Sequence, residues 1–403
     1  LSQRVYRTLQ RLRETYEAEA GIEQVTGVEV LGIASTGDGF ALQLRSAGDI
    51  REQRARKVLI ATGAADMPVA FPGAQLPGVM ATGGIQAVVK SQQFVPGTRF
   101  VFAGSHPLQL IVANQVAAAG GKVAAVVFSQ TRGDFLRLLL RPGPLLRQPG
   151  NALFFAGQVM KALRLGIPLR FGEVIARANG RDRLDSVDLQ AAHTDAWQTP
   201  SRLPCDRLGT CYGFLAQTEL LRQAGAACRW SEQRGGWIAQ HNQALETDIE
   251  GLYVAGESTG VAGAEVARLE GEIAGTAIAV ACGYVSEHET RADQRARRSR
   301  LAAVNAFAAL LADFSYTSHR TLLALMRDES TVCKCEEVTA GDLRQILQTQ
   351  PEIRDLSGLK LLSRCGMGHC QGRYCHYQLR ALMAASRGLS PEQLGGFTAR
   401  FPA

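Results

Sequence analysis

Residues 98–129 read T-R-F-V-F-A-G-S-H-P-L-Q-L-I-V-A-N-Q-V-A-A-A-G-G-K-V-A-A-V-V-F-S. An apolar strand leads into a turn at 104–107 and then into an apolar helix over 108–119, which Gly120 and Gly121 close before a second apolar strand. This pattern is a βαβ unit of about 30 residues, the size of one mononucleotide-binding half of a Rossmann fold. The sequence therefore predicts an α/β protein with a Rossmann-like domain in its middle.

The turn of this unit departs from the dinucleotide-binding pattern. G-S-H-P-L-Q at 104–109 keeps only the first glycine of G-x-G-x-x-G, and His106 stands where the pyrophosphate needs a residue without a side chain. The following strand ends in F-S-Q and offers no acid for a ribose. NAD(P) is therefore a doubtful cofactor of this domain. His106 is a candidate catalytic base, but a helix-start histidine near solvent is the favoured interpretation, because no nucleophile pattern accompanies it.

Length and composition limit the number of domains and the classes of partner that this chain can have. At 403 residues the chain is too long for one compact core, so we expect two or three domains. No apolar run reaches about 18 residues, the length that crosses a bilayer, so we expect no transmembrane segment. The net charge of +7 is not accompanied by a groove-reading motif or a basic stripe with interleaved aromatics, which disfavours a nucleic-acid partner.

Three glycine-bearing features predict a flavin site. The first is A-T-G at the end of a buried strand, and the second is G-L-Y-V-A-G-E, a strand that delivers a carboxylate able to accept hydrogen bonds from ribityl or ribose hydroxyls. The third is a glycine-rich helix start, whose amides and dipole stabilise a pyrophosphate or the charge of a reduced flavin. In this order and spacing they predict FAD binding by Ala61, Thr62, Gly63, Gly256, Glu257, Gly260, Val261 and Gly263.

Four cysteines near the C-terminus predict a metal centre, in the order C-x-C, a gap of 34 residues, and C-x4-C. Four thiolates on glycine-rich turns suit a [2Fe-2S] cluster, because glycine lets backbone amides approach the sulfurs. A structural zinc is the alternative, although zinc pairs are usually spaced more widely than C-x-C. A disulfide interpretation is weaker, because no signal peptide marks the chain as secreted. The predicted ligands are Cys333, Cys335, Cys370 and Cys375.

The remaining cysteines do not form a redox pair. No C-x-x-C or C-x4-C occurs in the flavin or nucleotide regions, and Cys205 and Cys211 have five residues between them on an expected strand and turn. Both are interpreted as core thiols, which argues against a disulfide reductase.

Over nearly its whole length the chain resembles the FAD and [2Fe-2S] subunit of bacterial heteromeric amine dehydrogenases, such as opine oxidase, hydrogen cyanide synthase and D-hydroxyproline dehydrogenase. The resemblance rests on A-T-G-A, F-P-G-A-Q-L-P-G-V-M-A-T-G-G-I-Q, G-L-Y-V-A-G-E-S-T-G-V-A-G with L-E-G-E-I-A-G, V-C-K-C-E-E-V-T, and S-R-C-G-M-G-H-C-Q-G-R-Y-C. The last two resemble the bacterioferritin-associated-ferredoxin-type cluster domain, whose ligands map onto the four cysteines named above. Cys365 lies five residues before Cys370 and is not called on by that motif, so we expect it not to be a ligand.

The family opens with a βαβ unit that carries G-x-G-x-x-G for the FAD pyrophosphate and an acidic residue for the ribose, and neither occurs here. The chain begins at Leu1 in the middle of an expected helix, so we expect this N-terminal unit to be missing from the sequence. If the absence is biological, FAD binding loses its main anchor; if the sequence is truncated, binding is intact in the full protein.

The expected fold class is α/β, a flavoprotein with two dinucleotide-binding (Rossmann-like) domains, an apparently missing N-terminal βαβ unit and a small, mainly helical [2Fe-2S] domain. We expect a first part of the FAD-binding domain at 1–96 and a second at 206–286, around an internal NAD(P)-binding-like Rossmann domain at 97–205. A helical linker at 287–330 then leads to the cluster domain at 331–385 and a tail at 386–403.

The resemblance implies an oxidoreductase subunit for CH-NH or CH-NH2 donors, which relays electrons from a secondary amine or amino acid oxidised by a partner. The implied partners are an FAD-containing subunit of amino-acid-oxidase type and a small ferredoxin-like subunit. The alternatives are an NAD(P)H-dependent flavin reductase that feeds the [2Fe-2S] centre and a non-catalytic cluster-bearing subunit. We expect a cytoplasmic protein, with peripheral contact to the inner membrane left open by the basic helical stretch at 132–170, whose arginines we expect to face solvent.

Overall fold

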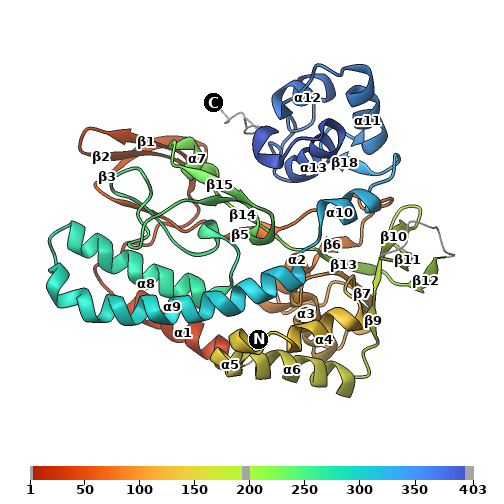
Figure 1. Ribbon diagram of the computed structural model, residues 1–403, viewed down its shortest axis with the longest axis horizontal. Helices are drawn as coiled ribbons and strands as arrows, with labels where there is room; N and C mark the ends of the chain where they lie inside the picture. The colour runs from red at the N-terminus through yellow and green to blue at the C-terminus, as the bar shows by residue number, and fades with distance from the viewer. Residues whose placement is uncertain (1–2, 193–199, 395–403) are drawn as a thin grey trace.

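The computed structural model describes residues 3–192 and 200–394. It begins with helix α1 (Gln3–Ala18) and contains two sheet-based regions side by side, with a small helical domain at residues 331–385 packed on top of them in the view of Figure 1. The expected α/β class with a mainly helical C-terminal domain is confirmed.

The internal region is built on a five-stranded parallel sheet in the order β6-β13-β7-β8-β9. Its strands are β6 (Val79–Ala81), β7 (Arg99–Gly104), β8 (Lys122–Phe128), β9 (Leu169–Phe171) and β13 (Arg207–Cys211). An antiparallel sheet of β10 (Glu173–Asn179), β11 (Ser186–Ala191) and β12 (Ser201–Pro204) stands beside it. Because β6 and β13 belong to the parallel sheet, this region extends beyond the boundaries of 97–205 that we expected.

The βαβ unit that the sequence predicts is present as β7, α3 (Leu108–Ala118) and β8. From its second residue on, β7 is buried, and α3 buries apolar side chains on more than one face because it lies between the sheet and the neighbouring helices α2 (Thr82–Ser91) and α6 (Pro149–Arg164). Buried Phe100, Phe102, Val112 and Val126 form part of this core. The prediction of strand, helix and strand is therefore confirmed.

The flavin-side region combines segments from both halves of the chain. Strands β1 (Glu29–Thr36), β2 (Gly39–Ser46) and β3 (Asp49–Ala55) form an antiparallel sheet. Strand β4 (Val58–Ile60) pairs in parallel with β17 (Leu252–Val254), and β5 (Ala64–Asp66) pairs antiparallel with β14 (Phe214–Ala216). The region is completed by α7 (Glu219–Gln223), the hairpin of β15 (Cys228–Ser231) and β16 (Gly236–Ala239), the 3-10 turn η1 (Glu232–Arg234) between them, the 3-10 turn η2 (Gly256–Thr259) and α8 (Ala264–Ala281).

The expected linker is mostly one long helix, α9 (Glu287–Ser315), followed by α10 (His319–Leu325). Ser286 starts α9 with a capping box, in which its side chain and that of Glu289 each accept a hydrogen bond from the other's backbone amide. Helix α9 runs alongside α8 and then crosses to the internal region (Figure 1).

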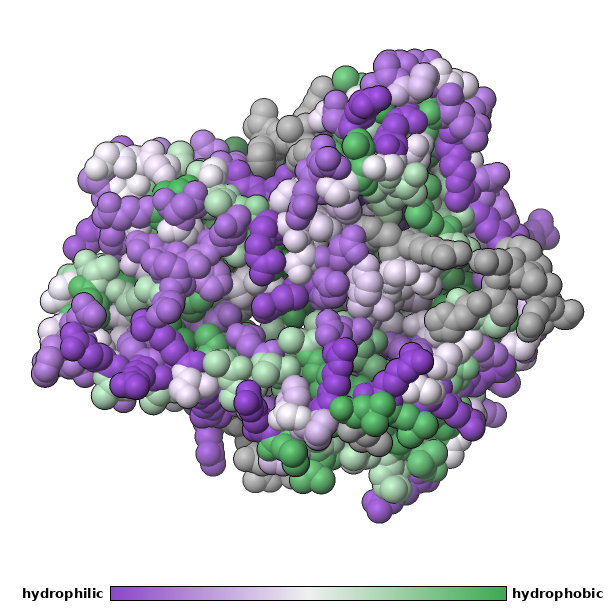
Figure 2. Space-filling model, viewed as in Figure 1, coloured by the Kyte–Doolittle hydropathy of each residue, from purple (hydrophilic) through white to green (hydrophobic). Residues whose placement is uncertain are grey.

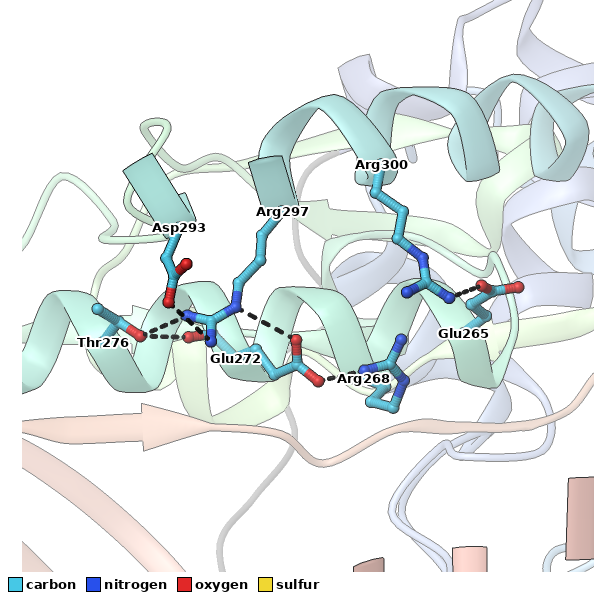
Figure 3. A network of polar contacts seen from close by, with 7 residues as sticks. All are labelled: Glu265, Arg268, Glu272, Thr276, Asp293, Arg297 and Arg300. Carbon is cyan, nitrogen blue, oxygen red and sulfur yellow. Dashed lines mark hydrogen bonds and ion pairs between the residues drawn. The ribbon is translucent and has the colours of Figure 1, made fainter. Parts of the chain in front are cut away.

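A polar network fixes the position of α9 along α8 (Figure 3). Arg297 donates to the hydroxyl of Thr276 at 3.1 Å and forms an ion pair with Glu272 at 3.4 Å, and Arg300 pairs with Glu265 at 2.9 Å. Half-exposed pairs of this kind contribute little energy singly. The buried amide of Gln294 adds a hydrogen bond to the carbonyl of Ile273 at 3.1 Å, so the two helices are held in one register.

The cluster domain contains the small hairpin of β18 (Thr331–Cys333) and β19 (Val338–Thr339), then α11 (Ala340–Thr349), α12 (Leu356–Ser363) and α13 (His376–Arg387), followed by η3 (Pro391–Leu394). Its own core joins side chains from all three helices, among them Leu343, Leu359 and Met383. Tyr377 of α13 instead belongs to the large core cluster that also contains Val101 of β7 and Trp230 of β15, so the domain is packed onto the rest of the chain.

The stretch at 132–170 forms α4 (Arg132–Leu139), α5 (Pro142–Arg147) and α6, broken where the sequence reads R-P-G-P. Arg137 faces solvent as expected, but leucines do so as well: Leu140, Leu146 and Leu153 are each more than 70% exposed. Figure 2 shows the resulting apolar patch at the bottom of the view, where Figure 1 places these helices. No helix among residues 3–192 and 200–394 has the length and apolarity to span a membrane.

Substitution of Gly104 by alanine tests the packing of the internal sheet. A Cβ at this position would lie 2.1 Å from the carbonyl oxygen of Cys211 on β13, whereas a Cβ at Gly157, an exposed position inside α6, would meet nothing within 4 Å. Gly104→Ala is expected to lower the free energy of unfolding by about 1–3 kcal/mol through overpacking. Gly157→Ala is expected to raise it by about 0.5–1 kcal/mol through helix propensity. Denaturant unfolding of both variants checks the prediction, and equal effects would contradict the close approach of β7 and β13.

Candidate flavin and iron-sulfur sites

The two halves of the predicted flavin site meet at one edge of a strand pair. Strands β4 and β17 run in parallel and end together, where the carbonyl of Ile60 accepts the amide of Ala255 at 3.1 Å. Just beyond, the hydroxyl of Thr62 donates to the carbonyl of Gln217 at 2.7 Å and lies 3.2 Å from the hydroxyl of Ser258. The A-T-G strand end and the G-E-S-T-G segment are therefore neighbours in space, although about two hundred residues separate them in sequence.

Glu257 lies in η2, three residues after the end of β17, as expected of a carboxylate at the strand's tip. Its Oε1 accepts the amide of Gly263 at 2.8 Å, and Gly263 is the N-cap of α8 and supplies no side chain there. Burial raises the pKa of Glu257, while the amides of Gly263 and Ala262 and the charge of Arg234 oppose that rise. The helix N-terminus and the carboxylate thus form one polar wall.

A cavity of about 410 Å³ lies against this wall. It is lined by Glu257, Val261 and Gly263 from the predicted set, and by Ala64, directly after the A-T-G strand end. The remaining lining includes Tyr212, which follows β13, Phe214 of β14, and α9 with the following Tyr316. The other predicted residues lie beside the cavity and do not line it: Ala61, Thr62, Gly63, Gly256 and Gly260.

These residues fit a flavin. The cavity combines mostly apolar walls with the carboxylate of Glu257 and the N-terminus of α8, whose dipole favours negative charge, which suits a flat ring that bears one charged edge when reduced. When FAD is bound, it supplies two-electron oxidation and reduction at this place. Glu257 and the first turn of α8 are the residues that would hold it.

Sequence reasoning missed the buried carboxylate of Glu270. It is 3% exposed and accepts hydrogen bonds from the amide of Gly256 at 2.8 Å and from the hydroxyl of Thr259 at 3.0 Å. Burial raises the pKa of Glu270, and these two donors limit the rise. Its place on the buried face of α8, in the second turn of the helix, is the signal that would have found it.

His106 differs from the expectation of a helix-start histidine near solvent. The ring is half-buried, lines the flavin-side cavity and packs edge-on against Phe214 with centroids 4.9 Å apart. Its Nδ1 accepts the amide of Leu108 at 3.2 Å, which places the ring proton on Nε2. Burial lowers the pKa of His106 to about 4, so the ring is neutral at pH 7.

The predicted cluster ligands come together in two groups of thiols. Cys333 contacts Cys375 and also Cys365, while Cys335 contacts Cys370. Within the part of the chain that the structure describes, no three metal-binding side chains are arranged to hold a single metal ion. Two adjacent groups suit a two-iron cluster, in which each iron takes two protein sulfurs, better than one zinc ion.

Backbone amides reach these sulfurs as the glycines predict. The thiols of Cys365 and Cys375 and the amides of Gly366 and Glu336 lower the pKa of Cys333 to about 2, despite burial, so the thiolate that binds iron is favoured. A Cβ at Gly368 would lie 2.2 Å from the Cβ of Cys335, so only glycine allows the second turn this close to the first.

Cys365 is the fifth thiol of this group. It is fully buried and contacts Cys333, although the family motif does not call on it. The thiol of Cys333 and burial raise the pKa of Cys365, which favours a neutral thiol beside the cluster. The other expected core thiols, Cys205 and Cys211, are buried and form no disulfide.

The cluster domain is held on the flavin-side region by an aromatic cage. The guanidinium of Arg380 lies 4.9 Å from the ring centroid of Trp230 and 5.4 Å from that of Trp237, and Tyr377 stacks on Trp230 with centroids 5.7 Å apart. Arg380 and Tyr377 belong to α13, which starts directly after Cys375. None of these four side chains is marked by a local sequence pattern, because the contacts join segments about 150 residues apart.

A second cavity of about 410 Å³ separates the cluster from the flavin-side region. Asp66 and Gln217 line it from the side of the A-T-G strand end, and Lys334 and His376 line it from the side of the two cysteine pairs. Lys334, between two predicted ligands, donates to the carbonyl of Ala74 at 3.0 Å and ties the first cysteine turn to the rest of the chain. This cavity therefore lies between the segment that follows the A-T-G strand end and the segment that carries the first cysteine pair.

The exchange of single cysteines tests the ligand set. Cys370→Ser is expected to abolish the visible absorbance and the electron paramagnetic resonance signal of the iron-sulfur cluster, because it removes one of four sulfurs. Cys365→Ser is the matched control: it changes an adjacent thiol and is expected to preserve most of both signals. Equal loss in the two variants would contradict the assignment of Cys333, Cys335, Cys370 and Cys375 as ligands.

Comparison with known proteins identifies both parts of the chain. A family model described as pyridine nucleotide-disulphide oxidoreductase matches residues 2–281, and one described as a BFD-like [2Fe-2S] binding domain matches residues 331–385. One of the subunits of opine oxidase from Rhizobium meliloti (strain 1021) is 32% identical over 362 residues, which cover 89% of this chain and 76% of that protein. The HcnB subunit of hydrogen cyanide synthase from Pseudomonas aeruginosa is 33% identical over 414 residues, which cover 100% of this chain and 85% of that protein.

Among solved structures, L-proline dehydrogenase from P. horikoshii matches with a TM-score of 0.65 at 20% identity. The match covers 93% of this chain and 62% of the length of that structure. At this identity the similarity supports the fold alone.

Proposed function

This chain belongs to the pyridine nucleotide-disulphide oxidoreductase family and ends in a BFD-like [2Fe-2S] domain, and we propose that it relays electrons from a secondary amine or amino acid oxidised by a partner subunit. FAD and a [2Fe-2S] cluster are the cofactors of this family combination. The proposed substrate class is an opine or a D-hydroxyproline-like imino acid, and the reaction class is dehydrogenation at CH-NH or CH-NH2. The similarity to subunits of opine oxidase and hydrogen cyanide synthase supports partner subunits.

The observation that carries this proposal is the separation of two segments by a single cavity. Asp66 and Gln217, near the A-T-G strand end, line one side of it, and Lys334, between two predicted cluster ligands, and His376 line the other, which supports a short path between flavin and cluster. The cage around Arg380 fixes that separation. A flavin accepts two electrons as a unit and a [2Fe-2S] cluster passes one at a time, so a fixed pair can divide a hydride-level oxidation into single-electron steps.

The residues of this chain have distinct parts in such a relay. Glu257 would hold the flavin by accepting hydrogen bonds from its hydroxyls, and the N-terminal dipole of α8 would stabilise the negative charge of the reduced form. His106 remains neutral and offers its Nε2 proton beside the same cavity. The four predicted cysteines would bind the cluster through their sulfurs, and the amides of Gly366 and Glu336 favour the thiolate form of Cys333. We assign the oxidation of the amine itself to an FAD-containing partner of amino-acid-oxidase type, and we include a small ferredoxin-like subunit in the complex.

We infer a cytoplasmic complex. The exposed apolar patch over α4, α5 and α6 is a surface of the kind that contacts a protein partner or a membrane surface, and its arginines favour anionic neighbours.

Co-expression with the genomic neighbours tests the proposed function. The purified complex is mixed without oxygen with a panel of amines that includes opines and D-hydroxyproline, and the flavin and cluster absorbances are followed. We expect one compound class to bleach both chromophores only when the partner subunit is present. Bleaching of both by NADH in the absence of a partner would overturn the relay and favour an NAD(P)H-dependent reductase.

Cofactor content separates the relay from the remaining alternative, a non-catalytic cluster-bearing subunit. One FAD per full-length chain in the purified protein is expected of the relay. A full-length protein that contains the cluster and lacks FAD would instead favour the non-catalytic subunit.

A further inference from the structure

The carboxyl ends of the internal parallel sheet carry a segment of this chain in the place of a ligand. In open α/β sheets, nucleotides bind in the crevice outside the carboxyl ends of the strands. Here the end of α9 lies in that crevice. The hydroxyl of Ser105, directly after β7, donates to the carbonyl of Ser315 at 2.6 Å, and the hydroxyl of Thr317 donates to that of Ser105 at 2.7 Å.

Gln130, just after β8, makes the second anchor. Its side-chain amide donates to the carbonyl of Phe314 at 2.7 Å and to that of Ser105 at 2.8 Å. In a dinucleotide-binding domain this strand end faces the ribose. Gln130 is 8% exposed and Ser105 is fully buried, so these hydrogen bonds are shielded from water and costly to break.

The turn that would bind a pyrophosphate has its amides occupied. The amides of Ser105 and His106 both donate to the carbonyl of Cys211 at 3.0 Å, because the turn lies directly against the end of β13. The amide of Leu108 donates to the ring of His106 and that of Gln109 to its carbonyl, and the intervening proline has no N–H. Each amide between 105 and 109 therefore has an acceptor inside the protein, and none points outward as a phosphate site requires.

The segment also divides the space that a dinucleotide would need. A cavity of about 370 Å³ lies on the side of β8, lined by Gln130 and Arg137, and the flavin-side cavity lies on the other side. Tyr316 and Thr317 line both cavities, so residues 314–317 form the wall between them. The hydroxyl of Tyr316 reaches across to the carboxylate of Glu232 on the flavin side.

We propose that residues 314–317 are a specificity-determining plug, which occupies the nucleotide crevice of the internal Rossmann domain and excludes NAD(P)H from the flavin. The crevice serves instead as the docking site of the linker that leads to the cluster domain. This proposal goes beyond the proposed function and does not depend on which amine is oxidised, because it concerns NAD(P)H, the class of electron donor that the plug excludes.

Dinucleotide binding is the first test. NADH and NADPH are titrated separately into the wild-type, full-length chain, and binding is followed by calorimetry and by energy transfer from tryptophan to the nicotinamide. We expect no saturable binding for either. A dissociation constant below about 0.1 mM for either compound would overturn the plug, since natural cosubstrate sites bind in that range.

Hydrogen exchange of the backbone amides is the second test. The double variant Gln130→Leu, Thr317→Val removes the hydrogen bonds of Gln130 to Phe314 and Ser105 and that of Thr317 to Ser105, and we expect at least about tenfold faster exchange at residues 314–317 than in the wild-type protein. Asp313→Asn is the matched control: it removes an exposed ion pair with Arg141 from the same helix end and is expected to leave that exchange unchanged.

Circular dichroism and thermal melting establish that the double variant is folded. If it does not fold, Ser105→Ala takes its place, since this change removes the hydroxyl's contacts to Ser315 and Thr317 and only one oxygen atom. Exchange at 314–317 that equals the wild-type rate in the folded variant would overturn the proposal, because these contacts would then not hold the segment in the crevice.

Discussion

The buried guanidinium of Arg380 determines where the iron-sulfur domain lies. It contacts the rings of Trp230 and Trp237 on the β15–β16 hairpin, and its helix starts immediately after the last cysteine of the cluster motif. Burial, with a contribution from Arg222, lowers the pKa of Arg380 to about 10, which still leaves it charged at pH 7. A desolvated cation over an aromatic ring is worth about 2 kcal/mol or more, so the contact favours one placement of the domain over others. The proposed electron transfer between flavin and cluster would depend on that placement.

The linker supplies the second constraint. Helix α9 is registered on α8 by Gln294 and by the ion pairs of Figure 3, and its far end is anchored to Ser105 and Gln130 in the internal region. The helix therefore spans the flavin-side and internal regions as a strut, and the short α10 then delivers the chain to the cluster domain. With one attachment through α9 and another through α13, the cluster domain is not a module on a flexible tether.

Local patterns predicted the parts of this arrangement that local chemistry determines. The βαβ unit follows from apolar strands, an apolar helix and closing glycines. The contacts among the four thiols follow from tight turns, in which the amide of Gly366 reaches Cys333 and Gly368 lets the turn of Cys335 approach closely. The sequence could not place Arg380 against Trp230 or Phe314 against Gln130, because these contacts join residues about 150 to 200 positions apart and leave no periodic signal. The contact of Cys365 was missed for a related reason: its spacing fits no ligand motif, yet a folded turn places it on Cys333.

The degenerate turn at 104–109 shows how a fold is retained while its ligand changes. Where the dinucleotide-binding pattern has its second glycine, this chain has His106. Its ring accepts a hydrogen bond from the amide of Leu108, and its own amide donates to the carbonyl of Cys211. Once the turn no longer presents donors, the crevice above the sheet is an apolar hollow with a few polar positions such as Ser105 and Gln130, and an exposed hollow of that kind is unfavourable in water. The end of a long helix fills the hollow and also supplies hydrogen-bond partners for its polar positions. Its terminal carbonyls lack partners within the helix and accept hydrogen bonds from the side chains of Ser105 and Gln130. A helix terminus and a nucleotide are thus interchangeable occupants of the same edge of the sheet, and in this chain the occupant is also the connection to the iron-sulfur domain.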